Sequence, residues 1–231
     1  MEILIATQNP GKAREFQILL APLGASIHFP SEVGLQIQVP EDGNTYFDNA
    51  RQKAIAHARA SGLLTLADDS GLEVDALDGA PGIHSARYTA GHDADRVAAL
   101  LAHLRDVPWE KRTARFRCVI VIAKPSGELY SAEGTCPGWI AFEPAGKGGF
   151  GYDPVFYLPD CDCTMAELPE PQKNRISHRA RAIAAAMPTL RHPHSANRAG
   201  PAQHPYLPLL SAGCRVLNQT CKTPAPMVTL C

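Results

Sequence analysis

Short apolar runs alternate along the chain with longer segments in which apolar residues recur every three or four positions. The runs at 2–7 and 63–67 have the length and composition of strands. Helical spacing is found in 13–24, where Gly24 is placed to end a helix, and in 93–106, which starts with acids and ends with a base. Strands that alternate with helices are typical of α/β proteins.

A further helix is expected to begin at Asn44 or Thr45. Asp48 follows Thr45 by three residues, which resembles a capping box, where two side chains satisfy free backbone amides at a helix start. Another helix is expected over 177–187, with the hydroxyl of Ser177 as its N-cap. The buried face of the earlier helix is marked by Ala50, Ala54, Ile55 and Ala58.

Residues 114–136 have the pattern of a β-hairpin, because two β-rich runs flank the turn segment 124–128. Glycines then cluster in 145–154, which is too rich in glycine for a strand and is expected to form a loop. An antiparallel hairpin added to alternating strands and helices predicts a mixed sheet. The expected fold class is therefore α/β with a mixed sheet.

Composition and charge exclude several classes of protein. Hydrophobic residues make up 45% of the 231 residues and charged residues 19%, which favours a folded domain with a substantial core. The net charge of -1 gives no basis for binding nucleic acid. No run approaches the ~20 apolar residues of a membrane span. The chain starts without the features of a signal peptide, so a cytoplasmic protein with reduced cysteines is expected.

The composition changes near residue 191. Residues 192–231 contain no acidic residue and only three basic ones, together with three cysteines and several prolines. All 23 acidic residues and 19 of the 22 basic residues therefore lie in 1–191, which carries a net charge of -4. We expect 1–191 to form the functional domain, and 192–231 to be a poorly ordered extension rather than a second domain.

The segment TQNPGK, Thr7 to Lys12, lies between the first strand and the first helix. Ligands of open α/β sheets collect at the carboxyl ends of strands, and helix N-termini attract phosphate. Gly11 allows close approach of the backbone, and Lys12 supplies a mobile cation. The segment lacks the longer glycine loop and the GK[ST] of a P-loop. A phosphate turn and an ordinary strand–helix turn with a surface lysine both fit it.

Two adjacent acids, Asp68 and Asp69 in LADDSG, stand where the apolar run 63–67 is expected to end. One interpretation is structural, with one acid capping a turn and the other solvated. The other is a site for Mg²⁺, which prefers one or two carboxylates plus phosphate oxygens. One carboxylate would then bind metal while the other orients or deprotonates a water molecule. Glu41, in PEDGNTY, is a candidate for a further ligand.

Two more segments suit a nucleotide. The glycines around Phe150 and Tyr152 suggest a flexible loop that presents aromatic rings to a base, although both rings could equally pack into the core. KNRISHR, residues 173–179, places basic side chains at a helix start, where they oppose the helix dipole and fit an anionic ligand. These side chains are Lys173, Arg175, His178 and Arg179. Taken together, the four features describe a pocket for a nucleoside triphosphate.

Five motifs occur in an order and spacing that resembles the inosine triphosphate pyrophosphatase family. They are ATQNPGK, EDGNTYFDNA, LADDSGLEVDALDGAPGIHSARY, PAGKGGFGYDPVF and KNRISHR. The resemblance covers about residues 1–190. It implies an elongated mixed α/β fold of two lobes with the active site in the cleft between them, and a homodimer whose interface includes the hairpin. It also implies Mg²⁺-dependent hydrolysis of ITP, dITP and XTP to the monophosphate and pyrophosphate, which cleanses the nucleotide pool.

The resemblance assigns roles to residues at matching positions. The catalytic residues would be Asp69 as general base for water, Asp68 in support and Lys12, although which acid takes the proton stays open. Glu41 and Asp69 would bind the metal. The phosphates would be held by Thr7, Gln8, Asn9, Pro10, Gly11, Lys12, Lys53 and Ser70. The base would be held by Phe150, Gly151, Tyr152, Asp153, Lys173, His178 and Arg179, with Phe150 stacking on it.

Two alternatives remain at this stage. A Maf-like pyrophosphatase would act on modified or pyrimidine nucleotides instead of ITP. A catalytically inactive relative would keep the pocket and lose the chemistry, although the intact acid pair and Lys12 argue against it. A pocket lined by donors would favour the 6-oxo group of hypoxanthine and xanthine over the 6-amino group of adenine, because a mismatch leaves a buried donor unpaired.

Overall fold

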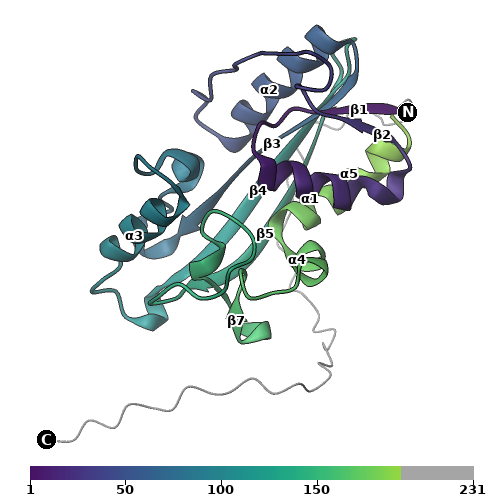
Figure 1. Cartoon of the computed structure of the whole chain (residues 1–231). Coiled ribbons are helices and arrows are strands. Elements are labelled where there is room, and N and C mark those ends of the chain that lie inside the picture. Colours follow the sequence, from purple (N-terminus) through teal and green to yellow (C-terminus); the bar gives the residue numbers. More distant parts are fainter. Residues whose placement is uncertain (194–231) are drawn as a thin grey trace, which may run out of the picture. The chain divides into compact units, whose positions relative to one another are not determined.

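The computed structural model describes residues 1–193, which contain a seven-stranded mixed sheet and five α-helices (Figure 1). The strands are β1 (Glu2–Ile5), β2 (Ser26–His28), β3 (Leu64–Val74), β4 (Thr113–Ala123), β5 (Leu129–Ile140), β6 (Phe156–Leu158) and β7 (Cys163–Thr164). The helices are α1 (Pro10–Leu20), α2 (Tyr46–Ser61), α3 (Asp93–His103), α4 (Glu170–Ile176) and α5 (His178–Arg191).

The sheet has the strand order β2-β1-β3-β4-β5-β6-β7. β1 runs parallel to β2 and β3, and every later pair of neighbours is antiparallel. Short parallel strands thus stand at one side of a long antiparallel meander. The predicted mixed α/β fold is confirmed.

Helices cover both faces of the long strands at one end of the sheet. Ile120 of β4 packs in a cluster with Phe16 of α1 and Ile183 of α5. The next residue, Val121, packs in a separate cluster with Ala54 of α2. Because successive side chains of a strand point to opposite faces, α2 lies across the sheet from α1 and α5.

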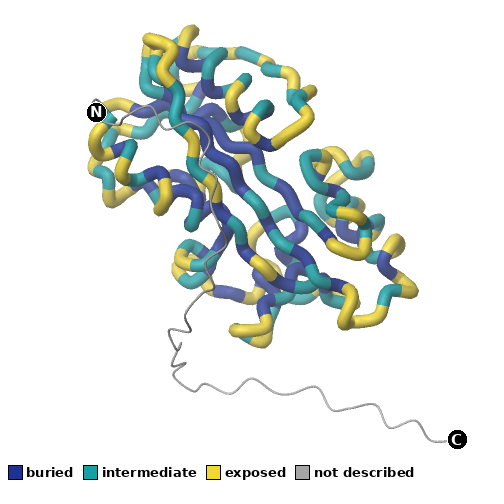
Figure 2. Tube along the Cα trace, turned by 180° about the vertical axis from the view of Figure 1, so that it is seen from behind, coloured by how far each residue is buried: buried dark blue, intermediate teal, exposed yellow. Residues whose placement is uncertain are grey.

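A second core lies at the other end of the long strands. Leu100 of α3, Leu72 of β3, Phe116 of β4 and Phe156 of β6 belong to this cluster. Figure 2 shows that buried residues, in dark blue, run along the central strands through both regions. The two ends of the sheet, with their separate cores, correspond to the two lobes that the family resemblance implies, and β3, β4 and β5 pass through both.

The predicted helix caps at Thr45 and Ser177 and the hairpin are confirmed, whereas the helix expected over 13–24 begins earlier, as α1 at Pro10, and ends at Leu20. The Thr45 hydroxyl accepts a hydrogen bond from the Asp48 amide at 3.1 Å, so Thr45 is the N-cap of α2. Ser177 caps α5 in the same way, through the Ala180 amide. β4 and β5 form the expected hairpin. Gly24, with φ of 63°, ends the short 3₁₀ turn that follows α1.

The acid pair does not end a strand, contrary to the expectation for 63–67. β3 continues through Asp68 and Asp69 to Val74, because β4 pairs with it along this whole length. The basic segment is also not a single helix start: α4 ends at Ile176, so Lys173 belongs to α4 and only the last two residues of the motif start α5.

The last described helix, α5, ends at Arg191. Apart from His192 and Pro193, the predicted extension 192–231 lies outside the described residues. Among the described helices, none combines the length and the apolar composition needed to cross a lipid bilayer. The cysteines of the described part, at 118, 136, 161 and 163, form no disulfide with one another.

Candidate functional site

A cavity of about 500 Å³ opens where β1 ends. β1 pairs with β3 only as far as Leu66, so the edge of β3 borders the cavity from the acid pair onward. This is the carboxyl end of a parallel strand, where ligands of such sheets bind. Predicted site residues that line it are Thr7, Gln8, Asn9, Lys12, Glu41, Lys53, Asp69, Ser70, Phe150, Gly151, Tyr152, Asp153, Lys173, His178 and Arg179. Pro10, Gly11 and Asp68 do not line it.

The turn between β1 and α1 presents a helix N-terminus to the cavity. Asn9 is the N-cap of α1, and its Oδ1 accepts a hydrogen bond from the Lys12 amide at 3.0 Å. The Thr7 hydroxyl accepts from the Asn9 amide at 3.2 Å. Pro10 occupies the first helical position, where a missing N–H costs nothing. The turn is therefore preorganised, and its free end suits an anion.

Gly11 is required by the aromatic ring of Phe150. A Cβ at Gly11 would lie 2.6 Å from a ring carbon of Phe150, closer than any real contact. The glycine loop thus packs its ring directly on the first turn of α1. The phosphate turn and the aromatic loop, 139 positions apart at these two residues, form adjoining walls of the same cavity.

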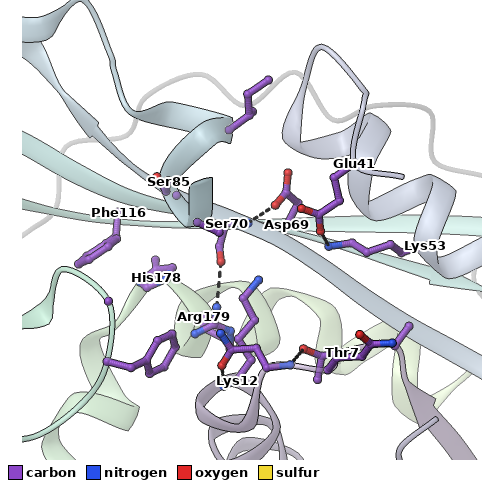
Figure 3. A pocket seen from close by; sticks show the side chains of 18 of the residues that line it. Thr7, Lys12, Glu41, Lys53, Asp69, Ser70, Ser85, Phe116, His178 and Arg179 are labelled. Carbon is purple, nitrogen blue, oxygen red and sulfur yellow. Dashed lines mark hydrogen bonds and ion pairs between the residues drawn. The ribbon is translucent and has the colours of Figure 1, made fainter. Parts of the chain in front are cut away.

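The two adjacent acids point to opposite faces of β3. Asp68 turns toward α1 and α5, where its Oδ2 lies 3.0 Å from Lys12 Nζ and 3.1 Å from Arg179 Nη2. Asp69 turns toward α2, where its Oδ2 accepts a hydrogen bond from Asn49 Nδ2 at 2.9 Å. Figure 3 shows Asp69 beside Glu41, with Lys12 and Arg179 on the other side of the strand. The alternation of side chains along a strand explains why neighbours in sequence have different partners.

The two acids also differ in acidity. Burial alone would raise the pKa of Asp68, but Lys12, Arg179 and Lys53 outweigh it and hold that pKa far below its ordinary value. The pKa of Asp69 is raised, because burial outweighs the attraction of Lys53 and the hydrogen bond from Asn49. Asp68 is therefore a fixed anion, whereas Asp69 is the more basic of the pair.

Lys53 links the acid pair to Glu41. Its Nζ donates to Glu41 Oε1 at 2.6 Å and to the backbone oxygen of Asp68 at 2.7 Å. Arg87 Nη1 lies 3.3 Å from the other carboxylate oxygen of Glu41. Burial would raise the pKa of Glu41, but Lys53 and the other nearby cations lower it below its ordinary value. Glu41 is thus an anion at neutral pH, beside Asp69.

The basic motif forms part of a buried ion network. Arg179 forms an ion pair with Glu15 of α1 and donates to the Ser70 hydroxyl at 2.9 Å. Lys173 Nζ lies 2.7 Å from Glu15 and 2.6 Å from Asp153. All four charged residues are at least 95% buried. Lys173 and Arg179 therefore hold buried carboxylates and also line the cavity. Arg175, in contrast, is exposed.

The aromatic loop divides its two rings between the cavity and the core. Lys173 Nζ lies 4.9 Å above the Phe150 ring, which lines the cavity. Tyr152 also lines the cavity, but it is 4% exposed and donates to the Ser85 carbonyl at 2.9 Å. Nearby, the His178 ring stacks on Phe116 with centroids 4.7 Å apart. Burial and the adjacent cations keep the pKa of His178 well below its ordinary value, so this ring is neutral.

A model of the Ham1 family matches residues 3–189, which is most of the chain. The chain belongs to the Ham1 family. This confirms the family that the sequence motifs indicated. The match covers all of the described helices and strands except the first strand residue and the end of α5.

Members of the Ham1 family from several bacteria are similar to this chain. A dITP/XTP pyrophosphatase from Desulforamulus reducens is 52% identical over 193 residues, covering 82% of this chain and 96% of the relative. The dITP/XTP pyrophosphatase of Bacillus subtilis is 45% identical, covering 79% and 93%. The solved structure of the Staphylococcus aureus Ham1 protein is 40% identical with a TM-score of 0.74, covering 84% of this chain and all of that one.

Four residues of this Ham1 site were missed by sequence reasoning. Asn49 holds Asp69, Glu15 joins Arg179 to Lys173, and Arg87 holds Glu41. Asp93, at the start of α3, accepts a hydrogen bond from the Gly151 amide at 2.7 Å and so fixes the glycine loop. A polar residue on a buried helix face is the only signal that could have revealed Asn49 and Glu15.

Proposed function

We propose that this chain hydrolyses the non-standard purine nucleoside triphosphates ITP, dITP and XTP to the monophosphate and pyrophosphate. The observation that carries the proposal is one cavity. It is lined by a helix N-terminus, by several cations, by Asp69 with its raised pKa, and by the ring of Phe150. The Ham1 relatives named dITP/XTP pyrophosphatases support it, because they align over at least 90% of their own length.

The phosphates would lie between the start of α1 and the cations of the cavity. The Gln8 amide, together with Lys12 and Lys53, offers a donor and positive charge there. Ser70 holds its hydroxyl toward Arg179 at 2.9 Å on the same cavity wall. This arrangement would neutralise the charge that develops as pyrophosphate leaves.

Asp69 is the proposed general base for the attacking water. Its raised pKa gives it affinity for a proton, and hydrogen bonds from Asn49 and from the Ser70 amide at 3.0 Å fix its carboxylate. Asp68 is unsuited to the task, because its pKa is held low and its carboxylate is 2% exposed. Its role would be to position Lys12 and Arg179.

The part of the cavity beside Phe150 would hold the purine, with the Phe150 ring stacking on it. Arg179 Nε and His178 Nδ1 are buried, and the described residues give neither atom a hydrogen-bond partner. Arg179 Nε can only donate. A 6-oxo group could supply the missing acceptor, whereas the 6-amino group of adenine could not. Such a mismatch can discriminate by about 10⁴-fold or more, which would exclude ATP.

Glu41 and Asp69 fit a Mg²⁺ ion bound together with the substrate. Their carboxylates lie side by side in Figure 3, and the charge of Glu41 contributes to the raised pKa of Asp69. The described residues contain no group of three or more metal-binding side chains. Two carboxylates completed by phosphate oxygens are the usual protein site for Mg²⁺. When bound, the ion would neutralise phosphate charge beside the acid that activates water.

A panel of triphosphates with detection of released pyrophosphate tests the function. ITP, dITP and XTP should be cleaved at least 10²-fold more efficiently than ATP in the presence of Mg²⁺, and EDTA should abolish turnover. The panel should include dTTP and UTP. A preference for these two would establish the Maf-like alternative, and binding of ITP without release of pyrophosphate would establish an inactive relative.

A cytoplasmic homodimer is also part of the proposal. Trp109 and Phe142 are exposed by 37% and 61%, and their rings lie 5.9 Å apart beside Tyr157. Exposed aromatic groups of this kind suit a protein interface. Size-exclusion chromatography with light scattering should give twice the mass of the chain, and Phe142→Ser should shift the equilibrium toward monomer. A monomeric wild-type chain would overturn the dimer.

A further inference from the structure

Helix α2 carries three polar residues on one face, on successive turns. Asn49, Lys53 and His57 recur every four residues, so they share one face of the helix, and Lys53 and His57 line the cavity. Each interval advances the helix by about 6 Å. Asn49 holds Asp69, and Lys53 holds Glu41. His57, one turn further, has no part in the chemistry described so far.

The imidazole of His57 is fixed with one nitrogen toward the helix. It is 5% exposed, and its Nδ1 lies 2.9 Å from the backbone oxygen of Lys53. A carbonyl oxygen can only accept, so Nδ1 carries a proton. This leaves Nε2, on the far side of the ring, to meet a group bound in the cavity.

His57 lies at the end of the cavity nearest the β1–α1 turn. Ala6, the residue before Thr7, packs in one cluster with Ala54 and Ala58 of α2. Thr7 therefore leaves the sheet beside the turn of α2 that carries His57. The Phe150 ring contacts the far end of this turn, at Gly11 in the first turn of α1.

We propose that His57 binds the terminal phosphates of the substrate and the pyrophosphate product. The inference rests on the proposed function, in which the base lies against Phe150 and Asp69 activates the attacking water, so that the phosphate under attack lies beside Asp69. The β- and γ-phosphates then extend past Lys53 toward His57. Because Nδ1 donates to the Lys53 carbonyl, Nε2 must also carry a proton to donate to a phosphate oxygen. The other charged groups of this region are Lys12, Lys53, Glu41 and Asp69.

Calorimetric titration with pyrophosphate and with inosine monophosphate, both in the presence of Mg²⁺, separates this role from a structural one. His57→Ala should weaken pyrophosphate binding about tenfold and raise KM for ITP by a similar factor, with kcat changed less than twofold. Binding of the monophosphate, which lacks the terminal phosphates, should not change. His57→Gln should recover part of the pyrophosphate affinity, because its amide can donate near the position of Nε2.

His103→Ala is the matched control, because His103 bonds Tyr88 and does not line the cavity. It should leave both affinities unchanged. Equal pyrophosphate affinity in wild type and His57→Ala would overturn the inference, as would an equal loss of monophosphate binding. A different result would overturn the proposed function: the wild-type protein would release no pyrophosphate from ITP, whatever its affinity for pyrophosphate itself.

Discussion

Asp69→Asn should lower kcat for ITP by about 10³-fold while ITP still binds. Asparagine has nearly the same shape, but its amide cannot take a proton from water. The asparagine oxygen would still accept a hydrogen bond from Asn49 or from the Ser70 amide, so the cavity wall should persist. Turnover is measured by pyrophosphate release, and ITP affinity by calorimetry with Ca²⁺ in place of Mg²⁺ to suppress hydrolysis.

Asp75→Asn is the control for this change. Asp75 follows β3 directly, is exposed and pairs with Arg115 outside the cavity. This variant should turn over ITP at the wild-type rate. A kcat within tenfold of wild type for Asp69→Asn would remove Asp69 as the base. Loss of ITP binding, rather than of turnover, would instead show that this carboxylate acts mainly on substrate affinity.

The parts of the fold that were predictable are those specified by local sequence. Thr45 and Ser177 cap helices through amides three residues away, so the signal and its effect lie together. β2, β6 and β7 contain only three, three and two residues, too few to display a period of two. β3 was truncated in prediction because its charged centre does not look like a buried strand, although pairing with β4 extends it.

The site residues that stand in sequence motifs were predictable. The residues that hold those side chains in place through long-range contacts were not. Lys12, Asp69 and Phe150 stand in recognisable segments and do line one cavity. Glu15 is separated from Arg179 by 164 positions, and nothing in either segment predicts that the two residues form an ion pair. The different acidities of the acid pair likewise depend on partners from three helices. Only the fold brings these charges together.

Arg179→Met should destabilise the protein by about 3–5 kcal/mol. The guanidinium is 1% exposed and holds Glu15 and Asp68, which are themselves 5% and 2% exposed. Methionine fills much of the volume but leaves two buried carboxylates with fewer cations. The free energy of unfolding is measured by urea denaturation at pH 7. Arg175→Met, an exposed arginine in the preceding helix, should change it by less than about 0.5 kcal/mol.

The pH dependence of the stability lost in Arg179→Met shows whether Arg179 stabilises the protein through its charge or through packing. Burial would raise the pKa values of Glu15 and Asp68, but Arg179 and neighbouring lysines lower both. An acid with a lowered pKa stabilises the fold above its unfolded pKa of about 4, and this contribution disappears as pH falls through the folded value. The difference between wild type and Arg179→Met should therefore be full at pH 7 and shrink below about pH 4. A difference that stays constant with pH would mean that Arg179 stabilises through packing alone, since packing does not titrate.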